Sequence, residues 1–176
     1  MRTNAVAFAC WALLASVAWA EPVTVPAVDL VLDGRAAAVI IVPDDPLPVV
    51  KAAAEELRYH VERASGARLP VVRETEAAAI GPRVLLGACR AARELDIPPK
   101  TIAPNGFVIR QVGERLVLAG DDSPGEPFWI QHGNRTRVGT LFAVYDFLQR
   151  QLGVRWLWPG KSGEVVPACR TVRASG

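Results

Sequence analysis

Short apolar runs that alternate with long amphipathic patterns constrain the fold of this chain most strongly. The run at residues 36–42 (AAAVIIV) is continuous and β-branched at its end, which is typical of a buried strand. Residues 47–64 then carry apolar side chains at three- and four-residue steps, and Gly66 follows them. This spacing predicts an amphipathic helix that begins near the cap signal Asp45-Pro46 and ends at Gly66.

The same alternation continues along the chain. Apolar runs at residues 69–72 and 83–87 predict two further strands, and residues 89–95 predict a short helix. Residues 107–118 alternate in polarity on either side of Gly113-Glu114. A glycine at the first loop position favours a type II′ turn, so this segment is predicted to be a β-hairpin.

A long irregular segment and a second helix complete the pattern. Residues 120–138 are rich in Gly, Pro, Asp and Asn, and a loop of this length in a compact domain is often functional. Thr140 is then expected to cap a helix that ends at Gly153, and residues 154–158 are expected to form a last strand. The predicted fold class is α/β: a two-layer sandwich in which helices pack on a mixed β-sheet, and not a doubly wound fold.

The first twenty residues have the layout of a secretory signal peptide. Arg2 precedes an apolar run, and Ala18-Trp19-Ala20 places small residues at the positions that a signal peptidase recognises. The run is shorter than the roughly 20 residues that cross a bilayer. We therefore expect cleavage after Ala20, export to the periplasm or the extracellular space, and no membrane association of the processed chain.

Two cysteines, Cys89 and Cys169, remain after this cleavage. An exported protein can join such a pair in a disulfide, which would bring the end of the chain beside residue 89. Two unpaired thiols are an equal alternative. The sequence leaves both open.

Charge and histidine content limit the possible functions. With 20 Lys+Arg against 18 Asp+Glu, the formal net charge of +2 gives no reason to expect nucleic acid as a partner. The only two histidines, His60 and His132, lack zinc-site spacing with the cysteines, and no cofactor motif is present, so no metal or cofactor is expected. His60 is expected to be a partly exposed helix residue. A weaker hypothesis is a small metal-dependent hydrolase that uses His132 together with Asp121 and Asp122.

The tryptophans in and after the long loop are candidate contact residues. Tryptophan faces pack into protein interfaces and also stack on sugar rings. If residues 154–158 form a strand, Trp156 and Trp158 share one face of it. Packing on the last helix or a neighbouring domain is the first interpretation and sugar contact the second. The candidates are Trp129, Arg155, Trp156 and Trp158.

Two segments carry a family resemblance. Residues 139–148 (GTLFAVYDFL) and 152–160 (LGVRWLWPG) resemble the end of the N-terminal domain of family 67 alpha-glucuronidases and of related exported bacterial proteins of unknown function. A similar domain precedes the barrel in family 20 beta-hexosaminidases. The resemblance covers about residues 30–168, and the GVRWLWPG segment is its most specific part. Further matching segments, in the same order, are 52–57, 65–66, 85–87, 105–107 and 116–120.

The resemblance implies a context of polysaccharide degradation. In those families the domain is an α/β sandwich without catalytic residues, and it precedes a (β/α)₈ barrel that carries the active-site acids. A barrel typically takes about 250 residues, so none fits in this chain of 176 residues. Residues 21–168 are therefore expected to form the N-terminal-like domain, and residues 169–176 a tail that begins an unfinished continuation, as in a gene fragment.

Two functions follow as expectations. The first is a non-catalytic accessory domain of an exported glycoside hydrolase-like protein, whose partner is a (β/α)₈ catalytic domain. The alternative is a free-standing carbohydrate-binding module that contacts polysaccharide through Trp129, Trp156 and Trp158. The first expectation predicts that Trp156 or Trp158 is unusually exposed in the isolated domain, because the surface that would cover it is missing.

Overall fold

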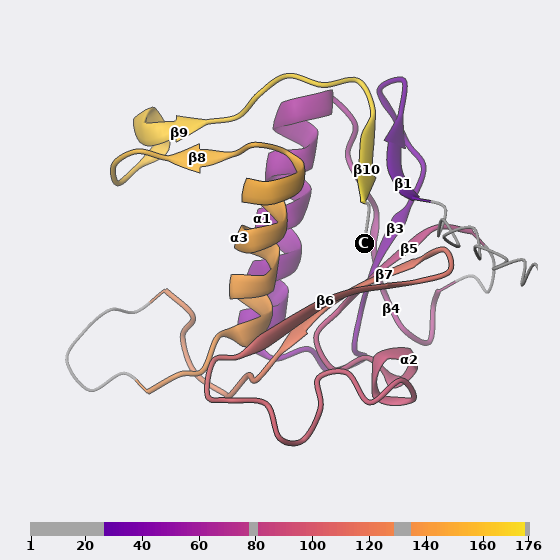
Figure 1. Ribbon diagram of the computed structural model, residues 1–176, viewed down its shortest axis with the longest axis vertical. Helices are drawn as coiled ribbons and strands as arrows, with labels where there is room; N and C mark the ends of the chain where they lie inside the picture. Colours follow the sequence, from indigo (N-terminus) through magenta and orange to yellow (C-terminus); the bar gives the residue numbers. More distant parts are fainter. Residues whose placement is uncertain (1–26, 78–80, 129–134, 175–176) are drawn as a thin grey trace, which may run out of the picture.

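A five-stranded mixed sheet forms the centre of the protein (Figure 1). The structure is a computed structural model that describes residues 27–77, 81–128 and 135–174. The strand order is β4-β3-β5-β7-β6. Four strands are parallel, and only β6 runs antiparallel, to its neighbour β7. The strands are β3 (Val39–Val42), β4 (Val71–Arg73), β5 (Arg83–Leu86), β6 (Phe107–Val112) and β7 (Arg115–Gly120).

Two long helices cover one face of this sheet. Helices α1 (Pro48–Ser65) and α3 (Gly139–Gln151) lie side by side and bury their apolar residues against it (Figure 1). The single-turn helix α2 (Arg90–Arg93) packs on the opposite face, where Ala92 belongs to a smaller apolar cluster. Successive strand residues alternate between the two clusters, as the period of a strand requires. The predicted sandwich of helices on a mixed sheet is confirmed.

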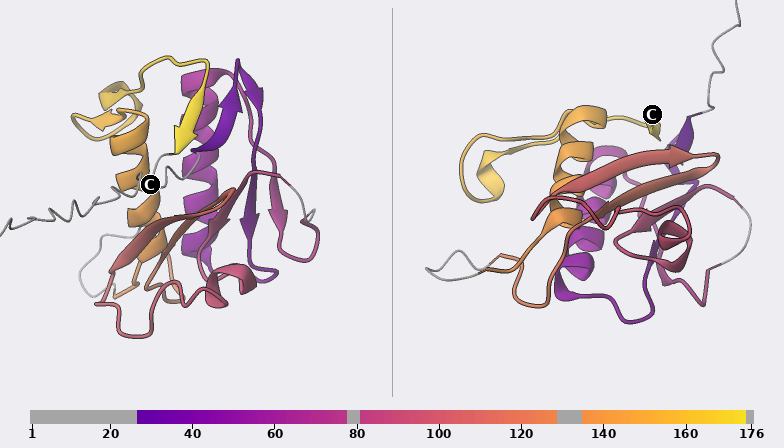
Figure 2. Two further views of the ribbon diagram at one scale, coloured as in Figure 1. Left: turned by 45° about the vertical axis from the view of Figure 1, so that its right-hand side comes forward. Right: turned by 60° about the horizontal axis from the view of Figure 1, so that its bottom comes forward.

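A second, three-stranded sheet joins the two ends of the described chain. Strand β1 (Val28–Leu32) pairs antiparallel with β2 (Arg35–Ala36) on one side and with β10 (Val172–Ala174) on the other (Figure 2). Neither β1 nor β10 is predicted from the sequence. Val172 and Ala174 are nevertheless buried in the main core, so the end of the described chain contributes to the packing of the domain.

The predicted strand 36–42 is broken in two. Ala37 and Ala38 both donate their backbone N–H groups to the carbonyl oxygen of Leu30, at 2.9 and 3.2 Å. These bonds turn the chain between the two sheets, so the first part of the run belongs to β2 and the second to β3.

The helix and hairpin predictions hold with small corrections. Helix α1 ends where Gly66 takes a left-handed φ of 76°, as expected of a C-terminal glycine. It begins two residues later than predicted: Leu47 is the cap residue and Pro48 occupies the first turn, in place of Asp45-Pro46. Gly113 in the β6–β7 turn has a φ of 58°, which fits the predicted type II′ turn.

A small hairpin lies at the C-terminal end of α3 (Figure 1). Strand β8 (Arg155–Trp156) pairs antiparallel with β9 (Glu164–Val165), and a 3-10 turn (Lys161–Gly163) precedes β9. The predicted strand 154–158 therefore ends at Trp156, because Pro159 and Gly160 turn the chain back soon afterwards.

The cysteines do not form a disulfide. Cys89 is buried in the small cluster beside α2, whereas Cys169 packs against the main core on the other face of the central sheet. Burial raises the pKa of the Cys89 thiol to about 12, which leaves it unreactive at neutral pH. None of the helices within the described ranges is both long and apolar enough to cross a bilayer.

Candidate functional site

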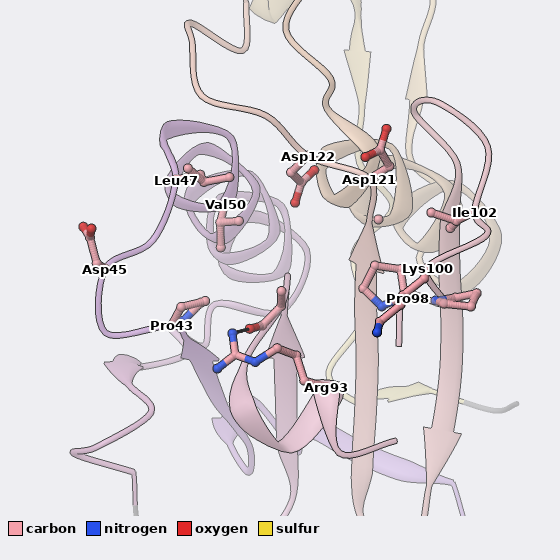
Figure 3. Close-up of a pocket in the computed structure, with 13 residues that line it drawn as sticks. Pro43, Asp45, Leu47, Val50, Arg93, Pro98, Lys100, Ile102, Asp121 and Asp122 are labelled. Carbon is pink, nitrogen blue, oxygen red and sulfur yellow. Dashed lines mark hydrogen bonds between the residues drawn. The ribbon is translucent and has the colours of Figure 1, made fainter. Parts of the chain in front are cut away.

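A cavity of about 420 Å³ opens at the carboxyl edge of the central sheet (Figure 3). Strands β3, β5 and β7 all end at this edge. The chain leaves β3 into α1 on one face and leaves β5 into α2 on the other. Such a reversal leaves a crevice outside the strand ends, and open α/β sheets bind their ligands there.

The cavity has both apolar and charged walls. Leu47 and Val50, from the start of α1, form an apolar wall, and Asp122 and Lys100 face the cavity from different sides (Figure 3). The guanidinium of Arg93 donates a hydrogen bond to the carbonyl oxygen of Ala88 at its rim. The remaining lining residues are Pro43, Asp45, Pro98, Pro99, Ile102, Gly120 and Asp121.

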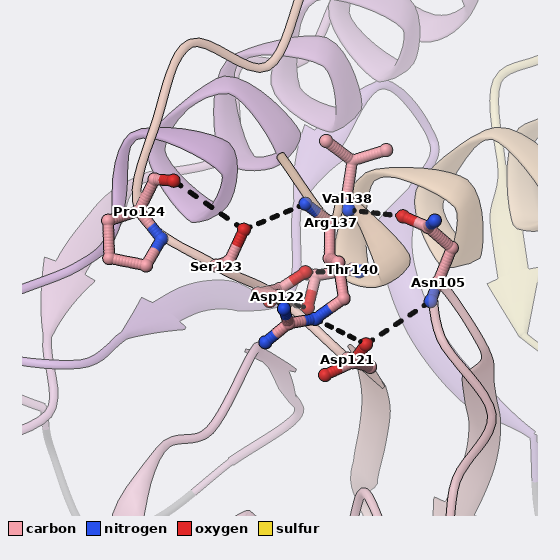
Figure 4. A network of polar contacts seen from close by, with 8 residues as sticks. All are labelled: Asn105, Asp121, Asp122, Ser123, Pro124, Arg137, Val138 and Thr140. Carbon is pink, nitrogen blue, oxygen red and sulfur yellow. Dashed lines mark hydrogen bonds and ion pairs between the residues drawn. The ribbon is translucent and has the colours of Figure 1, made fainter. Parts of the chain in front are cut away.

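A network of polar contacts fastens the two described ends of the long loop to this edge (Figure 4). The carboxylate of Asp121 forms an ion pair with Arg137 at 2.7 Å and accepts the backbone N–H of Asn105 at 3.2 Å. The side-chain carbonyl of Asn105 accepts the backbone N–H of Val138 at 2.8 Å. Ser123 accepts the backbone N–H of Arg137 at 2.8 Å. Asp121 is therefore turned toward the loop and not into the cavity.

Asp122 binds the start of α3. Its two carboxylate oxygens accept the backbone N–H of Thr140 at 2.9 Å and the Thr140 hydroxyl at 2.5 Å. Burial raises the pKa of Asp122, and the hydrogen bonds from Thr140 oppose that rise. The Thr140 hydroxyl also accepts the backbone N–H of Gly120 at 3.1 Å.

This arrangement corrects the predicted helix cap. Thr140 is not the cap residue, because it lies inside the first turn of α3 and its side chain is buried. Asp122 instead supplies the acceptor for a first-turn amide, from the end of β7.

Backbone packing is very close at the same place. A Cβ atom on Gly139 would overlap the backbone of Gly106 and Asp121, and one on Gly120 would overlap the backbone of Gly139. Only glycine allows strand β7 and helix α3 to approach each other in this way.

An exposed apolar surface lies at the opposite end of α3. We call it the β8–β9 surface and define it by Leu157, Trp158 and Val165, which are 60%, 55% and 46% exposed. The indole N–H of Trp158 donates to the hydroxyl of Ser162 at 3.3 Å, so the ring is held at the surface. The expectation that Trp156 or Trp158 is exposed is met by Trp158.

Trp156, by contrast, packs inward. Its ring contacts the rings of Tyr145 and His60 edge to face, with centroids 5.1 and 5.3 Å apart. The two tryptophans therefore do not share a face. A groove of about 350 Å³ runs past this side of α3 and is lined by Tyr145, Gln149 and Trp156.

His60 is buried, 1% exposed, so the expectation of a partly exposed histidine is wrong. Its Nδ1 lies 2.8 Å from the carbonyl oxygen of Glu56, and its Nε2 has no partner among the described residues. Burial raises the pKa of the neighbouring Glu56 carboxyl group. The histidine is covered because the β8–β9 hairpin folds over this part of α1, a contact between segments far apart in the sequence.

Side-chain contacts hold the hairpin against α1. Glu164 on β9 forms an ion pair with Arg63 at 2.6 Å and accepts the hydroxyl of Tyr59 at 3.0 Å. Arg155 donates to the carbonyl oxygens of Gln149 and Val154, at 2.9 and 2.8 Å. Arg155 thus satisfies a carbonyl near the end of α3, a structural role that cations often have there.

The remaining predicted site residues concern the long loop and a possible metal site. Trp129 and His132 lie outside the described residues. Across residues 27–77, 81–128 and 135–174, no three His, Cys, Asp or Glu side chains gather in a way that would hold a metal ion. Arg93, Lys100 and Thr140 were not expected at a site, since only the folded chain brings α2, its following loop and α3 to one edge.

Comparison with known proteins adds one distant similarity. No family model matches the sequence, and no curated protein matches it. Among solved structures, the chain is similar to a family 115 4-O-methyl-alpha-glucuronidase described as specific for decorated arabinogalactans. The identity is 16% and the TM-score 0.43, over 81% of this chain and 17% of that one. The matched part of this chain thus spans about one sixth of the length of that enzyme.

Proposed function

We propose that this protein is a non-catalytic accessory domain of an exported glycoside hydrolase-like protein, and that it docks on a (β/α)₈ catalytic domain through the β8–β9 surface. The observation that carries the proposal is that one small hairpin exposes three large apolar side chains, Leu157, Trp158 and Val165. Contiguous exposed apolar side chains mark interaction sites, and tryptophan is enriched among the residues that dominate binding energy.

The sequence supports the same surface independently of its exposure. Residues 152–160 are the most specific part of the resemblance to alpha-glucuronidase N-terminal domains, and Trp158 and Leu157 lie within them. In those proteins a barrel follows this domain. The signal-peptide layout of residues 1–20 supports export.

The acids at the carboxyl edge have structural partners. Asp121 is held by Arg137 and by the backbone of Asn105, and Asp122 by Thr140. Glycosidases instead use two facing carboxyl groups, one as acid and one as base or nucleophile. These contacts favour a scaffold role for both aspartates.

Association with a barrel tests the proposal. The purified protein is titrated by calorimetry with the (β/α)₈ domain of a family 67 alpha-glucuronidase produced without its own N-terminal domain. We expect association by the unaltered protein and by a Phe107→Ser control, since Phe107 is 39% exposed on β6, away from the hairpin. The double variant Leu157→Ser/Trp158→Ser should lose it. Absence of association by the unaltered protein, or full retention by the double variant, would contradict the proposal.

Carbohydrate binding is a second candidate, favoured by the groove beside Trp156. An aromatic wall from Tyr145 and Trp156 next to the amide of Gln149 offers a sugar both a stacking face and hydrogen-bonding groups. Titration with xylo-oligosaccharides tests it. Saturable binding that Gln149→Ala removes without lowering the melting temperature would support this candidate, and absence of binding would reject it.

A further inference from the structure

The cavity at the carboxyl edge carries opposite charges on opposite walls (Figure 3). Asp122 points into it from the end of β7, and Lys100 points into it from the loop that follows α2. The neighbouring acids do not compete for this space: Asp121 is turned toward Arg137, and the carboxylate of Asp45 is directed outward.

Asp122 has acceptor capacity left. Both of its hydrogen bonds come from Thr140, each to a different oxygen, and a carboxylate offers about four lone-pair sites. No cation forms an ion pair with it within the described part of the chain, although it is partly buried. Burying a carboxylate without a countercharge is unfavourable, so a donor placed in the cavity would stabilise it. Burial raises the pKa of Asp122, and the hydrogen bonds from Thr140 and the nearby charge of Arg137 oppose that rise.

The opposite wall favours an anion. Lys100 forms no hydrogen bond or ion pair with any residue that the structure describes, and Arg93, which also lines the cavity, uses one N–H group on Ala88. The first turn of α1, whose residues Leu47 and Val50 line the cavity, contains no acidic residue and no side-chain cap within the described chain.

The size and the remaining surface define the rest of the ligand. A volume of about 420 Å³ is at the lower end of ligand pockets, which suits a small molecule and not a polymer. Leu47, Val50 and Ile102 offer an apolar surface between the charged walls. A compact aliphatic body fits that surface.

We propose that this cavity binds a small organic acid that carries a hydroxyl or amino donor close to its carboxylate. The carboxylate lies on Lys100 and Arg93, the donor is accepted by Asp122, and the aliphatic body contacts Leu47 and Val50. The proposal goes beyond the docking function and does not depend on it, because the cavity and the β8–β9 surface lie at opposite ends of α3.

Four probes of nearly equal size distinguish the contribution of the ligand's carboxylate from that of its hydroxyl or amino donor. The purified protein is titrated with L-leucine, with its hydroxy analogue 2-hydroxy-4-methylpentanoate, with 4-methylpentanoate and with 3-methylbutylamine. We expect a Kd of about 1 mM or tighter for at least one of the first two. The last two, which lack the donor or the carboxylate, should bind at least tenfold more weakly. The difference between leucine and its hydroxy analogue identifies the preferred donor.

Variants locate the binding. Lys100→Gln, a change at an exposed side chain, should weaken the tighter ligand at least tenfold, whereas the charge-matched control Lys161→Gln near the hairpin should not. Asp122→Asn should weaken it similarly; because Asp122 also binds Thr140, this variant is compared with Thr140→Val, which loses part of the same contact but keeps the carboxylate and should retain binding. Both cavity variants should still associate with the barrel domain, which separates this proposal from the docking function. Failure of both leucine and its hydroxy analogue to bind, equal binding of all four probes, or an unchanged Kd in Lys100→Gln would overturn the proposal.

Discussion

The two ends of helix α3 are built in different ways. At its N-terminal end, glycine contacts and buried hydrogen bonds join the helix to strand β7, with Thr140 bonded to both Gly120 and Asp122. At its C-terminal end, side chains of a two-residue-per-strand hairpin rest on α1 and α3, and most of the hairpin surface is exposed. The N-terminal end of α3 is therefore joined to the central sheet through its backbone, whereas the hairpin contacts the C-terminal end mainly through side chains.

The two ends of α3 suit two different kinds of binding site, a cavity at the N-terminal end and a docking surface at the C-terminal end. A cavity needs walls that keep their positions, and the backbone contacts at Gly139 supply that rigidity. A docking surface needs exposed apolar side chains that the fold can tolerate, and a peripheral hairpin exposes them at little cost to the core. Substitutions at the two ends should therefore differ in their effect on stability.

The largest effect is expected at Gly139. Gly139→Ala would place a Cβ against the backbone of Gly106 and Asp121, so β7 and α3 must move apart. We expect a loss of about 3 kcal/mol in the free energy of unfolding, measured by urea denaturation. Gly163→Ala, where a Cβ would overlap the backbone of Trp158 in the hairpin, is the matched control and should lose about 1 kcal/mol. Equal losses would remove the contrast.

Thr140 gives the next largest effect. Thr140→Val keeps the shape of a buried side chain but leaves the Gly120 N–H and an Asp122 oxygen without their partner. We expect a loss of about 2 kcal/mol. Thr171→Val removes a single hydroxyl that accepts the backbone N–H of Asp33 at 3.3 Å in an exposed position, and should change stability by less than about 0.5 kcal/mol. If the Thr140 variant were as stable as the Thr171 variant, the hydrogen bonds of Thr140 with Gly120 and Asp122 would not contribute to stability.

The two tryptophans sharpen the contrast within the hairpin. Trp156→Ala removes a half-buried ring that contacts Tyr145 and His60, and should lower the free energy of unfolding by about 1.5 kcal/mol. Trp158→Ala removes an exposed ring and should change it by less than about 0.5 kcal/mol. Thermal and chemical denaturation of both variants measure the difference. A larger loss from Trp158→Ala would mean that the exposed surface belongs to the framework.

The smallest effect is a pH dependence. Burial raises the folded-state pKa of Asp122 at one end and of Glu56 at the other, so the folded protein binds these protons more tightly than the unfolded chain. Their contribution to stability is therefore present at low pH and is lost as pH rises through the folded-state pKa values. Asp122→Asn and Glu56→Gln should each flatten part of this decline in denaturation experiments at several pH values. A decline that is identical in both variants and in the unaltered protein would contradict this assignment.

Periodicity predicts those elements that bury one face over many residues. Helices α1 and α3 and the β6–β7 hairpin follow directly from spacing and from the glycines at 66, 113 and 153. Strands β1 and β10 do not, because each is short and its partner lies at the other end of the described chain. A pattern of three residues such as Val172–Ala174 carries too little periodicity to be recognised.

The candidate sites were predictable only in part. Exposed tryptophan beside Pro159-Gly160 pointed to a surface, and Trp158 is exposed. The cavity was not predicted, since Lys100 and Asp122 come from separate loops that meet only because their strands end at one edge. The burial of His60 was missed for a similar reason, because its cover comes from a later hairpin.

The central claim is that this protein binds partners without breaking bonds, and glycoside turnover tests it most directly. The purified protein is incubated with 4-nitrophenyl α-glucuronide, with 4-nitrophenyl β-N-acetylglucosaminide and with glucuronoxylan, and released product is followed over time. We expect no release above the rate in buffer. Turnover that follows the protein through successive purification steps and disappears in Asp121→Asn or Asp122→Asn would contradict the claim.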